Sequence, residues 1–409
     1  MFTTFIRRRR KRDSEHGGVA VIVALFLGSA VLFGSGALVI DVGLLYHERE
    51  QLISGADAAS FKVAINCAND PTACTPAAQT TVAGTYARNN ALDGQTAAQL
   101  CFNDTGCPTW NTTKQCLPRP PIPVGTYPGN WVEVRTSTIT RTGGTIIPPA
   151  LAGVATGGTY QGTRVGACAR VAWGPPAVDK VFALGISLCD WERMTNNGQV
   201  FYNPLGTLLN DIGLFQLIGL PSPAPGQDSA IPQVLPLTAL GLPLPSCTTP
   251  VDLTRPRGYV WLSNPDLTPP DADCMIDLKV DDLPRSFVLS GLLVGVYCAQ
   301  KLQALRTAGA PILVPIFDKI VPELVSLAPQ YHIVGFAPFV VTGYTGLLSG
   351  VLTGVTSLLS GSLLGALQTV LCGTGSCIYG YFTKVLLPRH SPVFGNGRNF
   401  GATVVGRIG

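Results

Sequence analysis

The sequence predicts an α+β protein. We expect an N-terminal transmembrane helix continuing into an extracytoplasmic helix, then a mainly antiparallel sheet domain with long Pro/Gly-rich loops and disulfides. Three observations support this prediction. Residues 17–40 form an apolar run without a charge, and all twelve cysteines follow that run. Segments with helical and strand periodicity then occur without a βαβ rhythm, which favours an antiparallel sheet.

The first 16 residues are predicted to be a basic cytoplasmic tail. The chain has a formal net charge of +4, and this tail alone accounts for it, so the remainder is neutral. A nucleic-acid-binding domain usually carries a basic face, so we expect no nucleic-acid partner. Basic residues beside an apolar span stay on the cytoplasmic side of the membrane. Here they are Arg7, Arg8, Arg9, Arg10, Lys11 and Arg12.

Residues 17–40 are predicted to cross the membrane as one uncleaved helix. These 24 residues contain no Asp, Glu, Lys or Arg. As a helix they extend about 36 Å, which is enough for a hydrocarbon core of roughly 30 Å. A cleaved signal peptide is the main rival, but its apolar region is usually about 7–15 residues long. A buried core helix is the other alternative.

Residues 41–66 are predicted to continue this helix outside the cell. Leu45, Leu52, Ala56, Ala59 and Val63 share one helical face, and polar residues occupy another. The apolar face suits packing on the following domain or on a partner helix. Packing within the chain is the simpler of the two interpretations.

The cysteines predict disulfides formed in an oxidising compartment. The chain has no CxxC spacing, which argues against zinc and thioredoxin-like sites. Cys67 with Cys74, and Cys372 with Cys377, are candidates for short disulfide loops. The sequence leaves the remaining pairings open.

Residues 67–409 are predicted to form one extracytoplasmic α+β domain. Val132 and Val134 share one strand face, and Val171 and Trp173 share another. Residues 220–270 contain twelve prolines, which exclude a regular helix or central strand and predict an irregular excursion. We expect strands at 132–136, 165–173, 312–317, 332–342, 378–386 and 402–407, and helices at 179–194 and 286–307.

A second apolar stretch complicates the topology. Residues 324–383 contain no Asp, Glu, Lys or Arg, and 347–371 are long enough for a second membrane helix. Gly and Ser recur within that segment, and a second crossing would place Cys377 in the reducing cytoplasm. We favour an apolar helix or hairpin packed on the domain, on a membrane or on a partner, with a second span as the alternative.

Residues 7–65 contain an ordered series of motifs. After the basic tail come Gly17-Gly18, the apolar span, Asp41-Val42-Gly43, Tyr46, Gln51-Leu52 and Ala56-Asp57-Ala58-Ala59. This series resembles the TadE/TadG-like proteins of bacterial Flp (tight-adherence) pilus assembly. The sequence departs from the family pattern at Ile53 and at Ser60-Phe61. Three later segments, at 164–173, 335–337 and 377–382, are similar to long actinobacterial members.

The resemblance implies a membrane-anchored scaffold or minor component of a Tad-type pilus assembly or secretion system. Such a protein acts by tethering and protein–protein contact. Its expected partners are the cytoplasmic membrane and pilus-assembly or other envelope proteins. A second copy of the chain, in a homo-oligomer, is a further candidate partner.

Catalytic motifs are absent from the sequence. It contains no HExxH, GxSxG or P-loop pattern. The acidic residues near Asp271 and Asp277 favour a solvated turn over a weak calcium loop. We therefore expect no enzyme activity, no cofactor and no metal site. Two alternatives remain: an anchored extracytoplasmic hydrolase with a site assembled from distant residues, and a surface adhesin or carbohydrate-binding protein.

Overall fold

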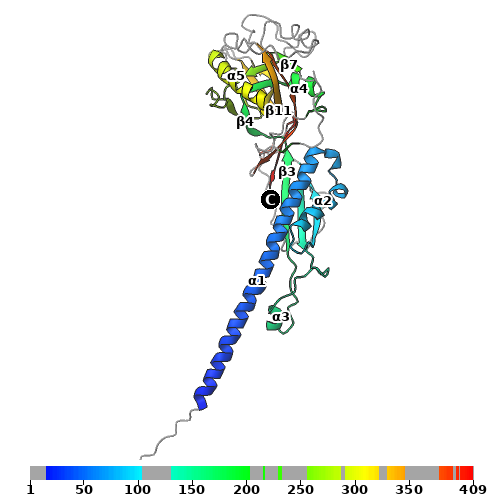
Figure 1. The fold of residues 1–409 in the computed structure, drawn as a ribbon, viewed down its shortest axis with the longest axis vertical. Helices are drawn as coiled ribbons and strands as arrows, with labels where there is room; N and C mark the ends of the chain where they lie inside the picture. Colours follow the sequence, from blue (N-terminus) through cyan, green and yellow to red (C-terminus); the bar gives the residue numbers. More distant parts are fainter. Residues whose placement is uncertain are drawn as a thin grey trace, which may run out of the picture.

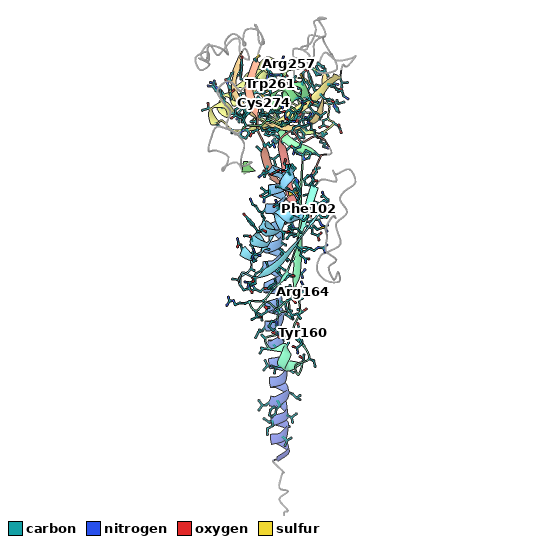
Figure 2. The ribbon with its side chains drawn as sticks, turned by 90° about the vertical axis from the view of Figure 1, so that its right-hand side faces the viewer. Phe102, Tyr160, Arg164, Arg257, Trp261 and Cys274 are labelled. Atoms are coloured by element: carbon teal, nitrogen blue, oxygen red, sulfur yellow. A yellow bond between two sulfur atoms is a disulfide. The ribbon has the colours of Figure 1, made fainter. Side chains whose placement is uncertain are left out.

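The computed structural model shows an elongated α+β protein, with a helical stalk at one end and a sheet-rich lobe at the other (Figures 1 and 2). Its sheets are mainly antiparallel and it contains disulfides, as the sequence predicted. The structure describes residues 15–103, 130–202, 215–216, 229–232, 256–286, 291–321, 329–345, 377–389, 393–395 and 397–408.

Helix α1 (Glu15–Asn69) joins the two predicted N-terminal helices into one helix of 55 residues. Its first half extends away from the body, and its apolar side chains are exposed there, with Leu25 at 67% and Leu32 at 73%. In the part of the chain that the structure describes, no helix has both the length and the apolarity that a membrane crossing requires. The span at 17–40 therefore stays a prediction.

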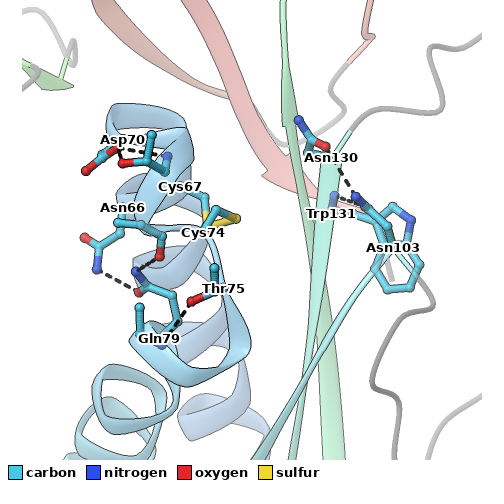
Figure 3. The surroundings of a disulfide bond; sticks show 12 residues. Asn66, Cys67, Asp70, Cys74, Thr75, Gln79, Asn103, Asn130 and Trp131 are labelled. Carbon is cyan, nitrogen blue, oxygen red and sulfur yellow. Dashed lines mark hydrogen bonds between the residues drawn. A yellow bond between two sulfur atoms is a disulfide. The ribbon is translucent and has the colours of Figure 1, made fainter.

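The second half of α1 packs against helix α2 (Pro76–Asn89), which runs back along it. A 3-10 turn, η1 (Pro71–Ala73), reverses the chain, and the Cys67–Cys74 disulfide closes this turn with a Cα–Cα distance of 4.8 Å (Figure 3). The predicted short-loop pairing is therefore present. The side chain of Thr75 caps α2 by accepting a hydrogen bond from the Ala78 N–H at 3.2 Å.

The sheet that packs on α1, which we call the helix-packed sheet, has six strands among the described residues. All its neighbouring strands are antiparallel except β13 and β14. Val132, Val134, Val171 and Trp173 share a core with the buried face of α1, which confirms the predicted strand faces. In spatial order the strands are β1 (Thr96–Phe102), β2 (Asn130–Thr138), β3 (Gly166–Gly174), β14 (Ala402–Arg407), β13 (Val385–Arg389) and β6 (Phe215–Gln216).

A second sheet, the apical sheet, has six described strands and lies beyond the C-terminal end of α1 (Figure 1). Only β10 and β5 run parallel among its described neighbours. In spatial order its strands are β7 (Ser229–Pro232), β12 (Cys377–Phe382), β11 (Gln330–Thr345), β10 (Ile312–Val321), β5 (Leu184–Ser187) and β8 (Tyr259–Trp261). Beside it lie the ribbon of β4 (Val178–Phe182) and β9 (Met275–Lys279), and helices α4 (Leu188–Thr195) and α5 (Gly291–Ala308).

Two predicted elements were wrong. Residues 179–194 do not form one helix: β4 and β5 come first, and only α4 is helical. Strand pairing of β4 with β9 and of β5 with β10 overrides the local helical preference. Residues 378–386 are not one strand, because the chain leaves β12 at Phe382 and enters β13 of the other sheet at Val385.

The Pro-rich region 220–270 contributes described strands only at sheet edges. Both β7 and β8 are edge strands of the apical sheet, as expected where prolines cannot donate ladder hydrogen bonds. The segment 347–371, considered as a second membrane helix, lies outside the described residues, as does Cys372. Cys101, Cys168, Cys189 and Cys377 are also disulfide-bonded, and Cys274 pairs with Cys298.

Candidate functional site

Most of the motif in the second half of α1 packs against the body. Leu52 is 2% exposed, and Ala56 and Ala59 are fully buried. At Gly55 an added Cβ would lie 3.0 Å from the Ala87 carbonyl oxygen, so the absence of a side chain there lets α1 and α2 approach closely. The simpler interpretation of the apolar face, packing within the chain, accounts for these residues.

The polar motif residues fix the helix to neighbouring elements. The Gln51 side chain accepts a hydrogen bond from the Leu92 N–H at 2.7 Å. Asp57 forms an ion pair with Arg407 of β14 at 3.0 Å. These bonds join α1 to the turn after α2 and to the C-terminal strand of the helix-packed sheet. The second half of α1 is thus held to the body by apolar packing and by polar contacts.

Asp41 makes the most unusual contact of the motif. Its carboxylate accepts backbone hydrogen bonds from Ala150, Leu151 and Ala152, with the Ala150 N–H at 2.6 Å. These N–H groups belong to the start of α3 (Ala152–Ala155), which has no local side-chain cap. Burial raises the pKa of Asp41, but the backbone hydrogen bonds outweigh it and hold the pKa below its usual value. A residue of the stalk thus caps a helix more than a hundred positions later.

Four of the remaining motif residues face outward. Gly18, Val42, Gly43 and Tyr46 are exposed, Ala58 is half-buried, and Gly17 lies in the first turn of α1. Tyr46 is 62% exposed. Arg7, Arg8, Arg9, Arg10, Lys11 and Arg12 lie outside the described residues.

Two of these outward residues line an open cleft of about 230 Å³ between α1 and the start of β3. Its walls are apolar, and two arginines reach it from different elements, Arg49 from α1 and Arg164 from the strand entry. Arg164 also donates to the Ser137 hydroxyl at 3.0 Å, which fixes its position. Guanidinium groups beside a phenol and apolar walls suit an anionic group attached to an apolar body. The lining residues are Val42, Leu45, Tyr46, Arg49, Arg164, Val165 and Gly166.

No protein-family model, curated protein or solved structure matches the chain. The TadE/TadG-like resemblance therefore stays a prediction based on the motif residues.

Acid–base groups elsewhere form structural pairs. His332 has one ring nitrogen 2.7 Å from Asp318 and the other 3.3 Å from Asp281, so both nitrogens face carboxylates. Asp271 pairs with Lys180 at 2.7 Å in the predicted acidic turn. Within the described ranges, no group of three or more His, Cys, Asp or Glu side chains is arranged to hold a metal ion.

Sequence reasoning missed the partner of Asp41 and both cleft arginines. Arg164 lies one residue before the predicted strand 165–173, and nothing in the sequence linked it to α1. One signal was available: residues 142–163 contain no Asp, Glu, Lys or Arg and are bracketed by Arg141 and Arg164. This uncharged stretch includes residues 150–152, which bind Asp41.

Replacing Asp41 with Ala is expected to release the start of α3 from α1. Amide hydrogen exchange at residues 150–152 should become faster by on the order of tenfold, because three backbone N–H groups lose their acceptor. Exchange measured by mass spectrometry in the full chain tests this. The matched control is Asp70→Ala, which removes the side-chain cap of η1 just after the C-terminal end of α1 and should leave 150–152 unchanged. Equal exchange rates at 150–152 in Asp41→Ala and in the native chain would contradict the hydrogen bonds from these residues to Asp41.

Proposed function

We propose that this protein is a membrane-anchored extracytoplasmic scaffold, or a minor component, of a Tad-type (Flp) pilus assembly or secretion system. Its N-terminus lies in the cytoplasm and its body lies outside the bacterial cytoplasmic membrane. It acts by tethering and protein–protein contact, without enzyme activity. One observation carries the proposal: α1 is a single helix whose first half is apolar and exposed, and whose second half is built into the body.

The exposed half of α1 supports a membrane anchor. Soluble monomers rarely expose apolar patches larger than a few hundred Å². Here apolar side chains are exposed over successive turns from Val19 to Ile40. The case for a span uses the whole uncharged run 17–40 of the sequence, including positions 29, 30 and 33, whose side chains lie outside the described residues. A continuous helix satisfies its own backbone hydrogen bonds in lipid.

The buried half of α1 supports a scaffold role. A tether joined to its domain by a flexible linker leaves the domain free to reorient. Here the helix itself packs on α2 and on β2 and β3, and ion-pairs with β14. An anchor built in this way holds the body at a fixed distance and orientation relative to the span. That property suits an assembly protein, and the motif resemblance specifies pilus assembly as the system.

Alkaline phosphatase fusions test the topology. A fusion after residue 70 and one after residue 409 should both be active, because phosphatase folds only outside the cytoplasm. Activity in the first fusion alone would mean that 347–371 crosses the membrane. Inactivity of the first fusion would refute the orientation. As a control, replacing the basic residues between Arg7 and Arg12 with Gln should lower the activity of the residue-70 fusion, since they hold the tail inside.

Gene deletion tests the assignment to pilus assembly. Cells lacking the protein should lose surface Flp filaments in electron microscopy, and the full chain should restore them. A chain released from the membrane by a cleavable signal peptide in place of residues 1–40 should not restore them, although its body is exported. Filaments that persist in the deletion strain would rule out this role while leaving the anchored body intact.

A further inference from the structure

The segment between β2 and β3 has an unusual composition for a surface excursion. Residues 142–163 contain no Asp, Glu, Lys or Arg. Large apolar side chains nevertheless point into solvent: Val154 is 84% exposed, Ile146 47% and Leu151 42%. Surface loops are usually polar and charged, so an uncharged loop with exposed apolar side chains indicates a covered surface.

The excursion reaches the membrane-proximal part of the molecule. It leaves the helix-packed sheet and runs along α1 toward its N-terminal end, with α3 beside the stalk (Figure 1). Asp41 holds residues 150–152, and Ala37, one helical turn earlier on the same face, is only 6% exposed. Ala37 belongs to the predicted span of residues 17–40. The start of α3 therefore lies level with the last turn of that span.

The excursion is held in a defined conformation. Ile147 and Thr163 form an antiparallel bridge, with hydrogen bonds of 2.9 and 3.3 Å. Gly162 permits this close approach, since it has φ +109° and an added Cβ would lie 2.0 Å from the Ile147 carbonyl oxygen. The bridge at the base and Asp41 near the tip fix the apolar side chains in place before any partner arrives.

Aromatic and basic residues follow in the order expected at a membrane surface. Tyr160 lies nearer than Arg164 to the N-terminal end of α1 (Figure 2). Arg164 lines the cleft with Tyr46 and Arg49, which follow Asp41 by one to two helical turns. Aromatic rings favour the headgroup level of a bilayer, and arginines bind lipid phosphates there.

We propose that residues 142–163 form a second membrane contact, in which Ile146, Leu151 and Val154 insert into the outer leaflet. Arg49 and Arg164 then lie at the level of the lipid phosphates. The inference rests on the proposed anchor, because the level of the bilayer is set by the span. Lipid is favoured over a protein as the covering surface because Asp41, the residue directly after the apolar span, holds residues 150–152 beside that span. Two contacts with the leaflet would restrain tilting and rotation of the body, which one helix leaves free.

Photocrosslinking in nanodiscs tests the proposal. The purified full chain is placed in phosphatidylethanolamine/phosphatidylglycerol nanodiscs, with p-benzoyl-phenylalanine in place of one exposed residue at a time. The test position is Val154. Leu25 on the stalk reports the anchor, and Val178 of β4 is an exposed apolar position in the apical lobe. Adducts with phospholipid are then measured by mass spectrometry. All three side chains are exposed, so the substitutions leave the core intact.

Lipid adducts at position 154 should approach the yield at position 25 and exceed that at 178 by on the order of tenfold, because an interfacial segment reaches the acyl chains. Lipid adducts at 25 without adducts at 154 would overturn the inference and leave the anchor standing. No lipid adducts at either position 25 or position 154 would overturn both the proposed anchor and the second membrane contact. Crosslinks from 154 to a second copy of the chain would show that protein, and not lipid, covers the excursion.

Discussion

Replacing Glu133 with Gln is expected to destabilise the helix-packed sheet by about 3–5 kcal/mol, because the change removes the anion from a buried ion-pair network. The Glu133 side chain is 2% exposed. It accepts hydrogen bonds from Arg135 on the same strand and from Arg170 on the paired strand, the latter through Nε at 2.7 Å. Arg170 also lies over the ring of Trp131 at 5.2 Å. In the Gln variant, the guanidinium groups of Arg135 and Arg170 no longer face a negative charge at position 133.

The effect should depend on pH. Burial raises the pKa of Glu133, but the hydrogen bonds from Arg135 and Arg170 outweigh it and place the pKa below the ordinary value of 4.5. A carboxylate with a lowered folded-state pKa contributes stability that is fully present above the unfolded pKa. That contribution is lost as the pH falls through the folded pKa. The difference between the native chain and Glu133→Gln should therefore be constant near neutral pH and shrink below about pH 4.5.

Hydrogen exchange of β2 and β3 across a urea series gives the free energy of unfolding for this sheet. The control is Arg407→Ala in the same sheet, where the ion pair with Asp57 has an arginine side chain that is 49% exposed. That change should cost at most about 1 kcal/mol. If Glu133→Gln were no more damaging than Arg407→Ala, the buried network would not be holding the sheet together.

The second large effect is expected in the apical lobe, where Asp190→Asn should cost about 3–5 kcal/mol. Asp190 is fully buried at the start of α4. Its carboxylate accepts from the Ser187 hydroxyl at 2.8 Å, the Gly258 N–H at 2.6 Å, Arg193 at 3.0 Å and Arg257 at 3.1 Å. It therefore connects α4 and β5 to the entry of β8. An amide replaces the charge and presents N–H groups where donors already point.

Protection of β8 and α4 against hydrogen exchange measures this effect. Asp273→Asn is the matched control, because Asp273 is 77% exposed and its pair with Lys301 at 2.8 Å lies on the surface. It should change stability by at most about 1 kcal/mol, which is the usual range for surface ion pairs. Exchange in β2 and β3 should stay unchanged in both variants. A similar loss for Asp190→Asn and Asp273→Asn would mean that burial adds nothing at position 190.

Features that depend on neighbouring residues were predictable from the sequence. The helical pattern of residues 41–66 identified the face of α1 that the structure buries, including Leu52, Ala56 and Ala59. Alternation along β2 identified Val132 and Val134 as core residues. The Cys67–Cys74 disulfide could be predicted because a separation of seven residues keeps the two cysteines close together in space. The membrane span at 17–40 and the pilus assignment stay predictions.

By itself, then, the sequence determined the fold class, the continuous N-terminal helix and the side chains that turn inward. Only the tertiary structure decided that β4 and β5 replace most of the helix predicted at 179–194, that the chain changes sheets between Phe382 and Val385, and that Asp41 binds residues 150–152. The physical reason is the range of the interactions. Helical and strand periodicity is set within one segment, whereas strand partners and buried hydrogen-bond partners are selected among segments far apart in the chain.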